Sequence, residues 1–235
     1  MGNISNLPWS KILKCDNKES YRSELFEPES PYVVVCEGFQ DVGLVCALLK
    51  HLNIVNCDVT YPKRSEGGNG KEAIHKAISL LSGRPEVEGV LVIADSDGNQ
   101  AKAFAEVRVG LAKFPIPPKA FSVVKQRSLR TGVFLLPGEG RTGALEHLLL
   151  EVVRGDRPDL IAHVETYRNN TLGTEQWSEN KNAKMKMQCI VAATCKRNPY
   201  CSLSWIWDEK YDAVPVRPDS PALQELSDFL VAFSS

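Results

Sequence analysis

The feature that most constrains the fold is a pair of short apolar runs, each of which ends at an acidic residue. Residues 32–36 are followed by Glu37, and residues 89–94 are followed by Asp95. Unbroken apolar and β-branched runs of this length are typical of strands that are buried on both faces of a parallel sheet. The sequence therefore predicts an α/β fold in which an acidic residue follows each of two inner strands.

The segments around these runs alternate between helix and strand patterns. Further strands are expected over residues 55–61 and 131–136, and helices over residues 41–52, 71–81, 100–113 and 143–153. Strands that alternate with helices in this way form βαβ units, which give a parallel sheet with helices on both faces.

The chain divides into three regions on the same patterns. Residues 1–30 show weak periodicity and are expected to form an irregular N-terminal extension, and residues 31–155 form the predicted α/β core. Residues 156–235 are expected to be a mostly helical region packed on the core, because apolar residues recur there with a helical period.

The composition excludes several classes of protein. The 235 residues carry a formal net charge of −1, so a polyanion would have to be bound by local basic patches or through metal. The seven cysteines include no Cys-x-x-Cys pair, which argues against a closed zinc site. Free thiols and the lack of a signal peptide predict a cytoplasmic protein, and no apolar run is long enough to predict a membrane span.

Four acidic residues follow the two inner strands: Glu37, Asp41, Asp95 and Asp97. Ligands of open α/β sheets bind at the carboxyl edge, and residues i and i+2 of an extended chain share one face. Clustered carboxylates repel one another unless cations neutralise them, and Mg²⁺ prefers oxygen ligands. The sequence therefore predicts one Mg²⁺ or Mn²⁺ site formed by these residues. A purely structural interpretation, with Asp41 as a helix cap and Asp97 in a turn, stays open at this point.

Both acidic motifs resemble those of the Toprim fold. Val-Val-Val-Cys-Glu37-Gly-Phe-Gln-Asp41 is similar to its first motif, a strand followed by Glu-Gly-x-x-Asp. Val-Leu-Val-Ile-Ala-Asp95-Ser-Asp97 is similar to its second motif, a strand that ends in Asp-x-Asp. The resemblance implies that Glu37 moves a proton, that the Asp-x-Asp aspartates bind Mg²⁺, and that Asp41 completes or orients the site.

A later segment is similar to one branch of these proteins, the DUF3226 family and the Toprim domains of OLD nucleases. A strand that ends in Pro137-Gly is followed by a Gly-Ala-Leu-Glu146 helix start, and residues 65–68 resemble a Gly-Gly loop of the same proteins. The resemblance implies that Glu146 is a further metal ligand. It also implies that Lys184, on a lysine-bearing helix near the C-terminus, contacts phosphate or stabilises transition-state charge.

The function that follows from the resemblance is Mg²⁺-dependent cleavage of DNA or RNA, with a regulatory protein or a second copy of the chain as a further expected partner. Nucleic acid is expected to bind a basic strip beside the site and the lysine-bearing helix, although a solvated loop and a solvated helix face are the alternatives. The basic residues concerned are Lys125, Arg127, Arg130, Lys181 and Lys186.

Two other functions stay open on the sequence. The chain could be a Toprim-like binding or adaptor subunit that performs no chemistry in a nucleic-acid-processing or defence complex. Alternatively, Asp95-Ser-Asp97-Gly is similar to the first motif of haloacid-dehalogenase phosphatases, in which Asp95 would be the nucleophile and Asp97 the acid/base. That alternative leaves Glu37 and Asp41 without a role.

Overall fold

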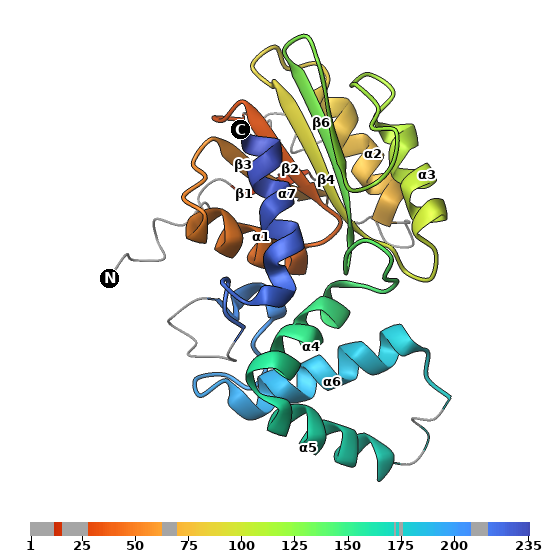
Figure 1. Cartoon of the computed structure of the whole chain (residues 1–235), viewed down its shortest axis with the longest axis vertical. Coiled ribbons are helices and arrows are strands. Elements are labelled where there is room, and N and C mark those ends of the chain that lie inside the picture. Colours follow the sequence, from red (N-terminus) through yellow and green to blue (C-terminus); the bar gives the residue numbers. More distant parts are fainter. Residues whose placement is uncertain (1–11, 16–27, 63–69, 172, 174–175, 208–215) are drawn as a thin grey trace.

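The computed structural model describes residues 12–15, 28–62, 70–171, 173, 176–207 and 216–235. They form a six-stranded sheet flanked by helices, and a further layer of helices lies beyond one edge of that sheet (Figure 1). This arrangement confirms the predicted α/β fold. The loop at residues 65–68 falls outside the described residues.

The sheet has the strand order β1-β3-β2-β4-β6-β5. All neighbouring strands are parallel except β5 and β6, which form an antiparallel pair. The strands are β1 (Ile12–Cys15), β2 (Tyr32–Cys36), β3 (Cys57–Pro62), β4 (Gly89–Asp95), β5 (Ser122–Gln126) and β6 (Leu129–Leu136). Because β2 and β4 are parallel neighbours at the centre, the residues that follow them emerge at the same edge of the sheet.

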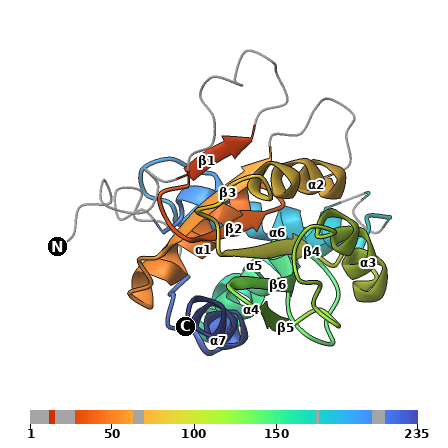
Figure 2. The same cartoon turned by 90° about the horizontal axis from the view of Figure 1, so that it is seen from above.

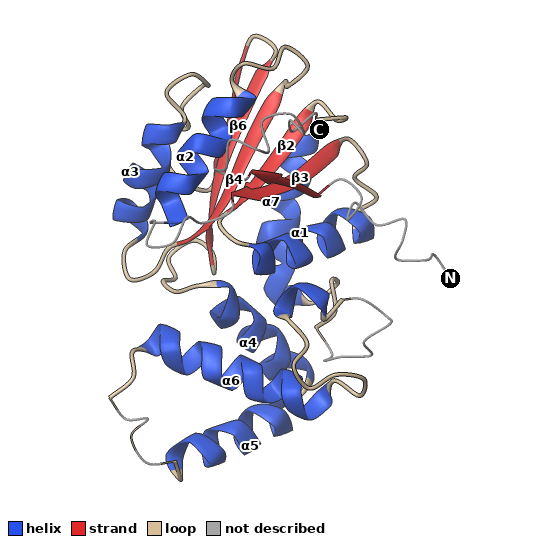
Figure 3. Ribbon diagram, turned by 180° about the vertical axis from the view of Figure 1, so that it is seen from behind, coloured by secondary structure: helices blue, strands red, loops and turns tan. Residues whose placement is uncertain are grey.

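Two groups of helices surround this sheet. α2 and α3 cover one face, and α1 and α7 cover the other (Figure 2). Helices α4, α5 and α6 pack on one another beyond the carboxyl edge of the strands (Figure 3). The helices are α1 (Phe39–His51), α2 (Gly70–Leu81), α3 (Gln100–Gly110), α4 (Leu145–Asp156), α5 (Pro158–Asn169), α6 (Glu179–Thr194) and α7 (Gln224–Ser234), with 3-10 turns η4 (Leu203–Trp205) and η5 (Pro221–Leu223).

The inner strands are apolar throughout because their side chains alternate between two hydrophobic clusters. In β2, Val33 and Val35 belong to the cluster under α2 and α3, whereas Val34 and Cys36 belong to the cluster under α1 and α7. All four side chains are fully buried. A strand with a buried position at every residue needs a continuous apolar sequence, which explains why these strands are recognisable from the sequence.

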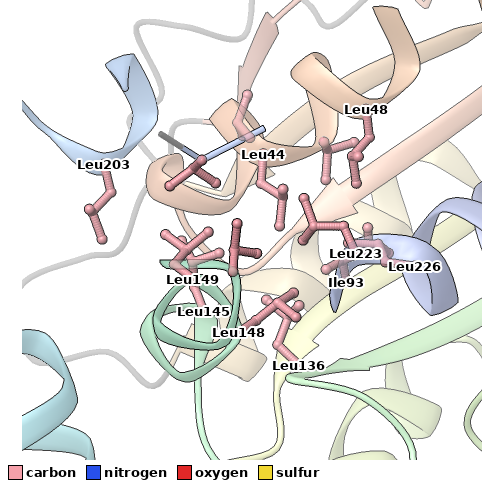
Figure 4. Packing of buried hydrophobic residues seen from close by; sticks show 14 of the residues in the cluster. Leu44, Leu48, Ile93, Leu136, Leu145, Leu148, Leu149, Leu203, Leu223 and Leu226 are labelled. Atoms are coloured by element: carbon pink, nitrogen blue, oxygen red, sulfur yellow. The ribbon is translucent and has the colours of Figure 1, made fainter. Parts of the chain in front are cut away.

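A leucine-rich core joins the sheet to the helical layer. Leu145, Leu148 and Leu149 of α4 lie in one cluster with Leu44 of α1 and Leu136 of β6 (Figure 4). Each fully buried leucine contributes roughly 1.5–3 kcal/mol to the free energy of unfolding. This core fixes the first turn of α4 against the carboxyl ends of the central strands.

Two edge strands were not predicted. Residues 1–30 were expected to be irregular, but residues 12–15 form β1, which pairs in parallel with β3. At the other edge β5 pairs antiparallel with β6, and its side chains are half-buried or exposed. Short edge strands that are not buried at every position need no continuous apolar sequence. The pattern that reveals the inner strands is therefore missing from them.

A close approach of two main chains is expected to make Gly43 of α1 irreplaceable. A Cβ atom at this position would lie 2.6 Å from the Cα atom of Ser204 in η4. Gly43→Ala should therefore lower the free energy of unfolding by about 1–3 kcal/mol, as overpacking does. In the matched variant Gly155→Ala, an added Cβ meets no atom within 4 Å in α4, and the helix should gain about 0.5–1 kcal/mol. Urea unfolding of both variants measures the difference, and equal stabilities would contradict the close approach.

Candidate functional site

The pairing of β2 with β4 brings the first two acidic residues together. Cys36 is opposite Ile93 in the register, so Glu37 lies level with Ala94, one residue before Asp95. The main-chain N–H of Glu37 donates to the carbonyl of Ile93 at 2.9 Å, and the N–H of Asp95 donates to Glu37 Oε2 at 3.1 Å. The Glu37 carboxylate is therefore fixed across the two strand ends.

Asp41 lies in the first turn of α1, directly after the same strand. Its Oδ2 atom accepts a hydrogen bond from the N–H of Gly38 at 2.8 Å, which caps the start of the helix. The residue is also buried, and it lines the same cavity as Glu37. Asp41 is therefore compatible with both interpretations of the sequence, as a helix cap and as a member of the acidic cluster.

Glu146 reaches the site from α4. The N–H of Leu145, at the first position of that helix, donates to Asp95 Oδ1 at 3.1 Å. The positive end of the α4 dipole thus faces the Asp95 carboxylate, which favours the ionised form. Glu146 follows directly in the first turn and is buried. The sequence resemblance placed this glutamate near the other acids, and the helix start brings it there.

The four carboxylates share one cavity of about 320 Å³. We call this cavity the acidic pocket. Phe39 and Tyr61, whose ring centroids are 5.3 Å apart, form an aromatic part of its wall, and Lys184 of α6 lies at its lining from the helical layer. The residues that line it are Glu37, Gly38, Phe39, Gln40, Asp41, Tyr61, Pro62, Asp95, Leu145, Glu146 and Lys184.

The electrostatics of the acidic pocket centre on Asp95. Burial raises the pKa of this carboxyl well above its usual range, and the neighbouring charges of Asp41, Glu37, Glu146 and Asp97 raise it further. Within the described residues, no three Asp, Glu, His or Cys side chains form a ready-made metal site. The crowding of negative charge nevertheless favours the uptake of a proton or a cation, because either would relieve the repulsion.

Asp97 lies apart from the acidic pocket. Its backbone has a positive φ of 50°, so the chain leaves the extended conformation in which residues i and i+2 share a face. The Asp97 carboxylate instead binds Lys71 Nζ at 3.0 Å through Oδ2 and Asn180 Nδ2 at 3.4 Å through Oδ1. The structure therefore separates Asp97 from the other four predicted carboxylates.

A hydrogen-bonded loop holds the end of β4 against the start of α4. Ser96 is buried, and its hydroxyl accepts from the N–H of Gly143 at 3.0 Å and donates to the carbonyl of Gly143 at 3.3 Å. The N–H of Asp97 donates to the same carbonyl at 2.8 Å. Gln100 Nε2 binds the carbonyls of Gly138 and Arg141 in that loop. These contacts fix the relative positions of Asp95 and Glu146.

Comparison with known proteins identifies the family. A family model described as a protein of unknown function, DUF3226, matches residues 31–234. The chain belongs to the DUF3226 family. No curated protein and no solved structure gave a match. The match confirms the resemblance to DUF3226 drawn from the sequence, whereas the link to the Toprim fold stays a prediction. The segment shared with the DUF3226 family contains every acidic residue of the pocket and Lys184.

The basic strip of this DUF3226 protein does not lie beside the acidic pocket, so that expectation is wrong. Lys125 and Arg130 are paired in the β5–β6 hairpin, and Arg130 is opposite Gly89 at the start of β4. The hairpin therefore lies at the amino edge of the sheet, and Arg127 lines a separate hollow there. Arg130 is buried and donates to the carbonyl of Phe233 at 2.6 Å, which anchors α7.

The three lysines of α6 differ in their surroundings. Lys184 is exposed and lines the acidic pocket. Lys186 forms an ion pair with Glu165 of α5 at 2.5 Å, and Lys181 lies over the ring of Trp177 with its Nζ 4.4 Å from the centroid. Lys184 is therefore the lysine of this helix that can contact a ligand of the acidic pocket.

Lys71 and Ser96 were not predicted from the sequence. Lys71 lies at the start of α2 after a glycine-rich segment, and such segments before a helix are a known signal for phosphate or anion sites. Ser96 lies between the two aspartates of the Asp-x-Asp motif, where nothing in the sequence marks its hydroxyl for a structural role. None of the described helices is both long and apolar enough to cross a membrane.

Asp95→Asn is expected to change the pH dependence of stability in the metal-free protein. Because the folded-state pKa of Asp95 is raised, the folded protein keeps a proton that the unfolded chain has already lost above the ordinary aspartate pKa. Wild-type stability should therefore fall as the pH rises through that window, and Asn should remove this fall. At neutral pH the variant should therefore be more stable than wild type, and the gain should vanish in acid, where both forms of the wild-type chain carry the proton.

Urea unfolding across a pH series in the presence of a chelator measures this effect. Asp156→Asn removes a charge from an exposed position at the end of α4 and serves as the control. If the free energies of unfolding of Asp95→Asn and wild type differ by the same amount at every pH, this would contradict the raised pKa of Asp95 and the crowding of carboxylates around it.

Proposed function

We propose that this chain is a metal-dependent nuclease that hydrolyses phosphodiester bonds of DNA or RNA at the acidic pocket, with Mg²⁺ or Mn²⁺ as cofactor. The observation that carries the proposal is the convergence of Glu37, Asp41, Asp95 and Glu146, from two strand ends and two helix starts, on one cavity. The similarity of their motifs to the Toprim fold supports the same reaction class.

The residues of the acidic pocket fit a hard divalent cation. The charged groups around Asp95 are carboxylates, and Mg²⁺ and Mn²⁺ prefer oxygen ligands. Burial and the neighbouring carboxylates raise the pKa of Asp95, and a cation bound beside it would offset their charge. Asp41, Asp95 and Glu146, with Glu37, would hold the ion. When bound there, it would neutralise phosphate charge and assist the attack of water.

Glu37 is the proposed proton-transfer group. Its Oε2 atom accepts a hydrogen bond from the N–H of Asp95, which holds the carboxylate in one orientation at the lining of the acidic pocket. A general base needs this kind of fixed position within reach of the proton that it removes. Lys184 approaches from α6 and supplies a positive charge that can contact a phosphate oxygen.

The phosphatase alternative has less support. It requires Asp97 as an acid/base beside Asp95, whereas the Asp97 carboxylate is bound by Lys71 and does not line the acidic pocket. It also assigns no role to Glu37, which the strand pairing brings next to Asp95. The adaptor alternative predicts that the chain cleaves no nucleic acid, and the assay below distinguishes it from the nuclease.

Removal of either central carboxylate is expected to abolish cleavage. Glu37→Gln should lower the rate by about 10²–10⁴-fold, the usual contribution of a general acid or base. Asp95→Asn should lower it to a similar extent because one ligand charge is lost. The assay follows cleavage of labelled single-stranded and duplex DNA and RNA with Mg²⁺ or Mn²⁺, and a chelator should stop the reaction.

Glu88→Gln is the matched control. Glu88 is exposed at the amino end of β4, so the same chemical change is made at the opposite edge of the sheet. This variant should cleave like wild type. Equal rates in wild type, Glu37→Gln and Asp95→Asn would contradict the proposal, as would hydrolysis of a small phosphate ester in place of nucleic acid. Absence of cleavage together with a protein that co-purifies would favour the adaptor.

Nucleic acid is expected to bind through Lys184 and not through the β5–β6 hairpin. Lys184→Ala, made in a Glu37→Gln background that prevents cleavage, should reduce the slope of log K against log salt by roughly 0.7–0.9, the value for one phosphate contact. The double variant Lys125→Ala/Arg127→Ala should leave the slope unchanged, because the hairpin lies at the amino edge. Fluorescence anisotropy with a labelled oligonucleotide measures both slopes. A loss confined to the hairpin variant would show that substrate binds the other edge of the sheet.

A further inference from the structure

Lys71 is a buried cation held between two carboxylates beside the acidic pocket. It lies in the first turn of α2, and only 8% of its side chain is exposed. Its Nζ atom is 3.0 Å from Asp97 Oδ2 and 3.5 Å from Glu106 Oε2. An ammonium group at such a site remains charged because its partners offset the loss of hydration.

Asp97 is fixed toward Lys71 by contacts on several elements. Its N–H is bound to the carbonyl of Gly143 at 2.8 Å, and its second carboxylate oxygen lies 3.4 Å from Asn180 Nδ2 of α6. With a φ of 50°, the backbone at Asp97 departs from the extended conformation of β4. The position of Asp97 is therefore set by α2, α6 and the loop before α4 together.

The charge of Lys71 also acts on the acidic pocket. Burial lowers the pKa of Lys71, but the hydrogen bond and charge of Asp97, with the charges of Glu37 and Glu106, raise it by more. The net shift is upward, so Lys71 is positive at neutral pH. The influence of Glu37 shows that the ammonium lies within electrostatic reach of the pocket that Glu37 lines.

The carboxylates of this edge thus fall into two groups. One group, Glu37, Asp41, Asp95 and Glu146, lines the acidic pocket. The other, Asp97 and Glu106, surrounds a lysine. Sites with two metal ions hold them about 3.5–4 Å apart, so carboxylates must be available to both positions. Asp97 lies two residues after Asp95 in the sequence. It would be the carboxylate to bind a second metal ion beside the first, but it binds Lys71.

We propose that the Lys71 ammonium takes the place of a second divalent cation beside the acidic pocket, so that the chain binds one divalent cation and not two. This inference rests on the proposed function, because it assumes that the acidic pocket holds the first cation. Lys71 acts here as a positioning residue, since it fixes Asp97 and supplies one positive charge without contacting the pocket ligand.

The number of Mn²⁺ ions bound per chain tests this inference directly. Electron paramagnetic resonance of free Mn²⁺ gives the stoichiometry at saturation, with no requirement for activity. Wild type should bind one ion, and Lys71→Met, which keeps most of the side-chain length, should bind two. Lys71→Arg retains the charge and should bind one. Lys76→Met removes an exposed lysine from the same helix and should also bind one.

A double variant connects the second ion to Asp97. In Lys71→Met/Asp97→Asn the released carboxylate is gone, so the count should return to one. A cooperative thermal unfolding transition verifies that each variant is folded. If Lys71→Met does not fold, the test rests on Lys71→Arg, because binding of two ions by Lys71→Arg would overturn the inference. One ion in folded Lys71→Met, or two in wild type, would overturn the inference alone. No Mn²⁺ bound by wild type would overturn the proposed function and this inference with it.

Discussion

Electrostatic repulsion among the carboxylates at the carboxyl edge of the sheet is the constraint on which the rest of the site depends. Parallel pairing of β2 with β4 places Glu37 beside Asp95, and the burial of α1 and α4 brings Asp41 and Glu146 to the same cavity. A polypeptide that gathers buried negative charge in this way loses stability unless other groups offset it. Main-chain amides offset part of it, because the N–H groups of Gly38, Asp95 and Leu145 each donate to one of these carboxylates. The neighbouring carboxylates still raise the pKa of Asp95, and the proposed cation would offset the charge that the amides leave.

The surrounding structure holds the carboxylates together against this repulsion. The leucine-rich core fixes α4 beyond the carboxyl edge of the sheet, and the Ser96 hydroxyl joins the end of β4 to Gly143, two residues before that helix. Farther out, Arg141 binds Glu151 of α4 and Glu225 of α7, so the loop between β6 and α4 is tied to helices on both sides. Sites of this kind trade stability for function, and the apolar packing that compensates for the unfavourable charges lies in neighbouring elements.

The sequence predicts the parts of this arrangement that depend on local pattern. β2 and β4 are recognisable because all their residues except Tyr32 and Asp95 are buried, and the acids at their ends were correctly expected at one sheet edge. Two features could not be predicted, because they depend on tertiary structure or on a single dihedral angle. The positive φ of Asp97 directs its carboxylate to Lys71, which lies 26 residues away in the sequence. The antiparallel turn between β5 and β6 carries Lys125 and Arg127 to the edge opposite the acidic pocket, although their distance along the chain gave no sign of it.

The acidic pocket is asymmetric in a way that bears on how a substrate would be oriented. Its carboxylates come from the sheet edge and from the starts of α1 and α4, whereas its lysine comes from α6 in the helical layer. Phe39 and Tyr61 form the aromatic part of the wall. The ring of Phe39 also packs on Trp205, and the two ring centroids are 5.9 Å apart. In the proposed reaction a phosphate would lie between the carboxylates and Lys184, and the adjoining sugar or base would face the aromatic wall, where stacking is tolerant of base identity. Such an orientation makes backbone chemistry, and not base sequence, the feature that the pocket itself recognises. Any sequence preference would then have to come from residues outside the acidic pocket.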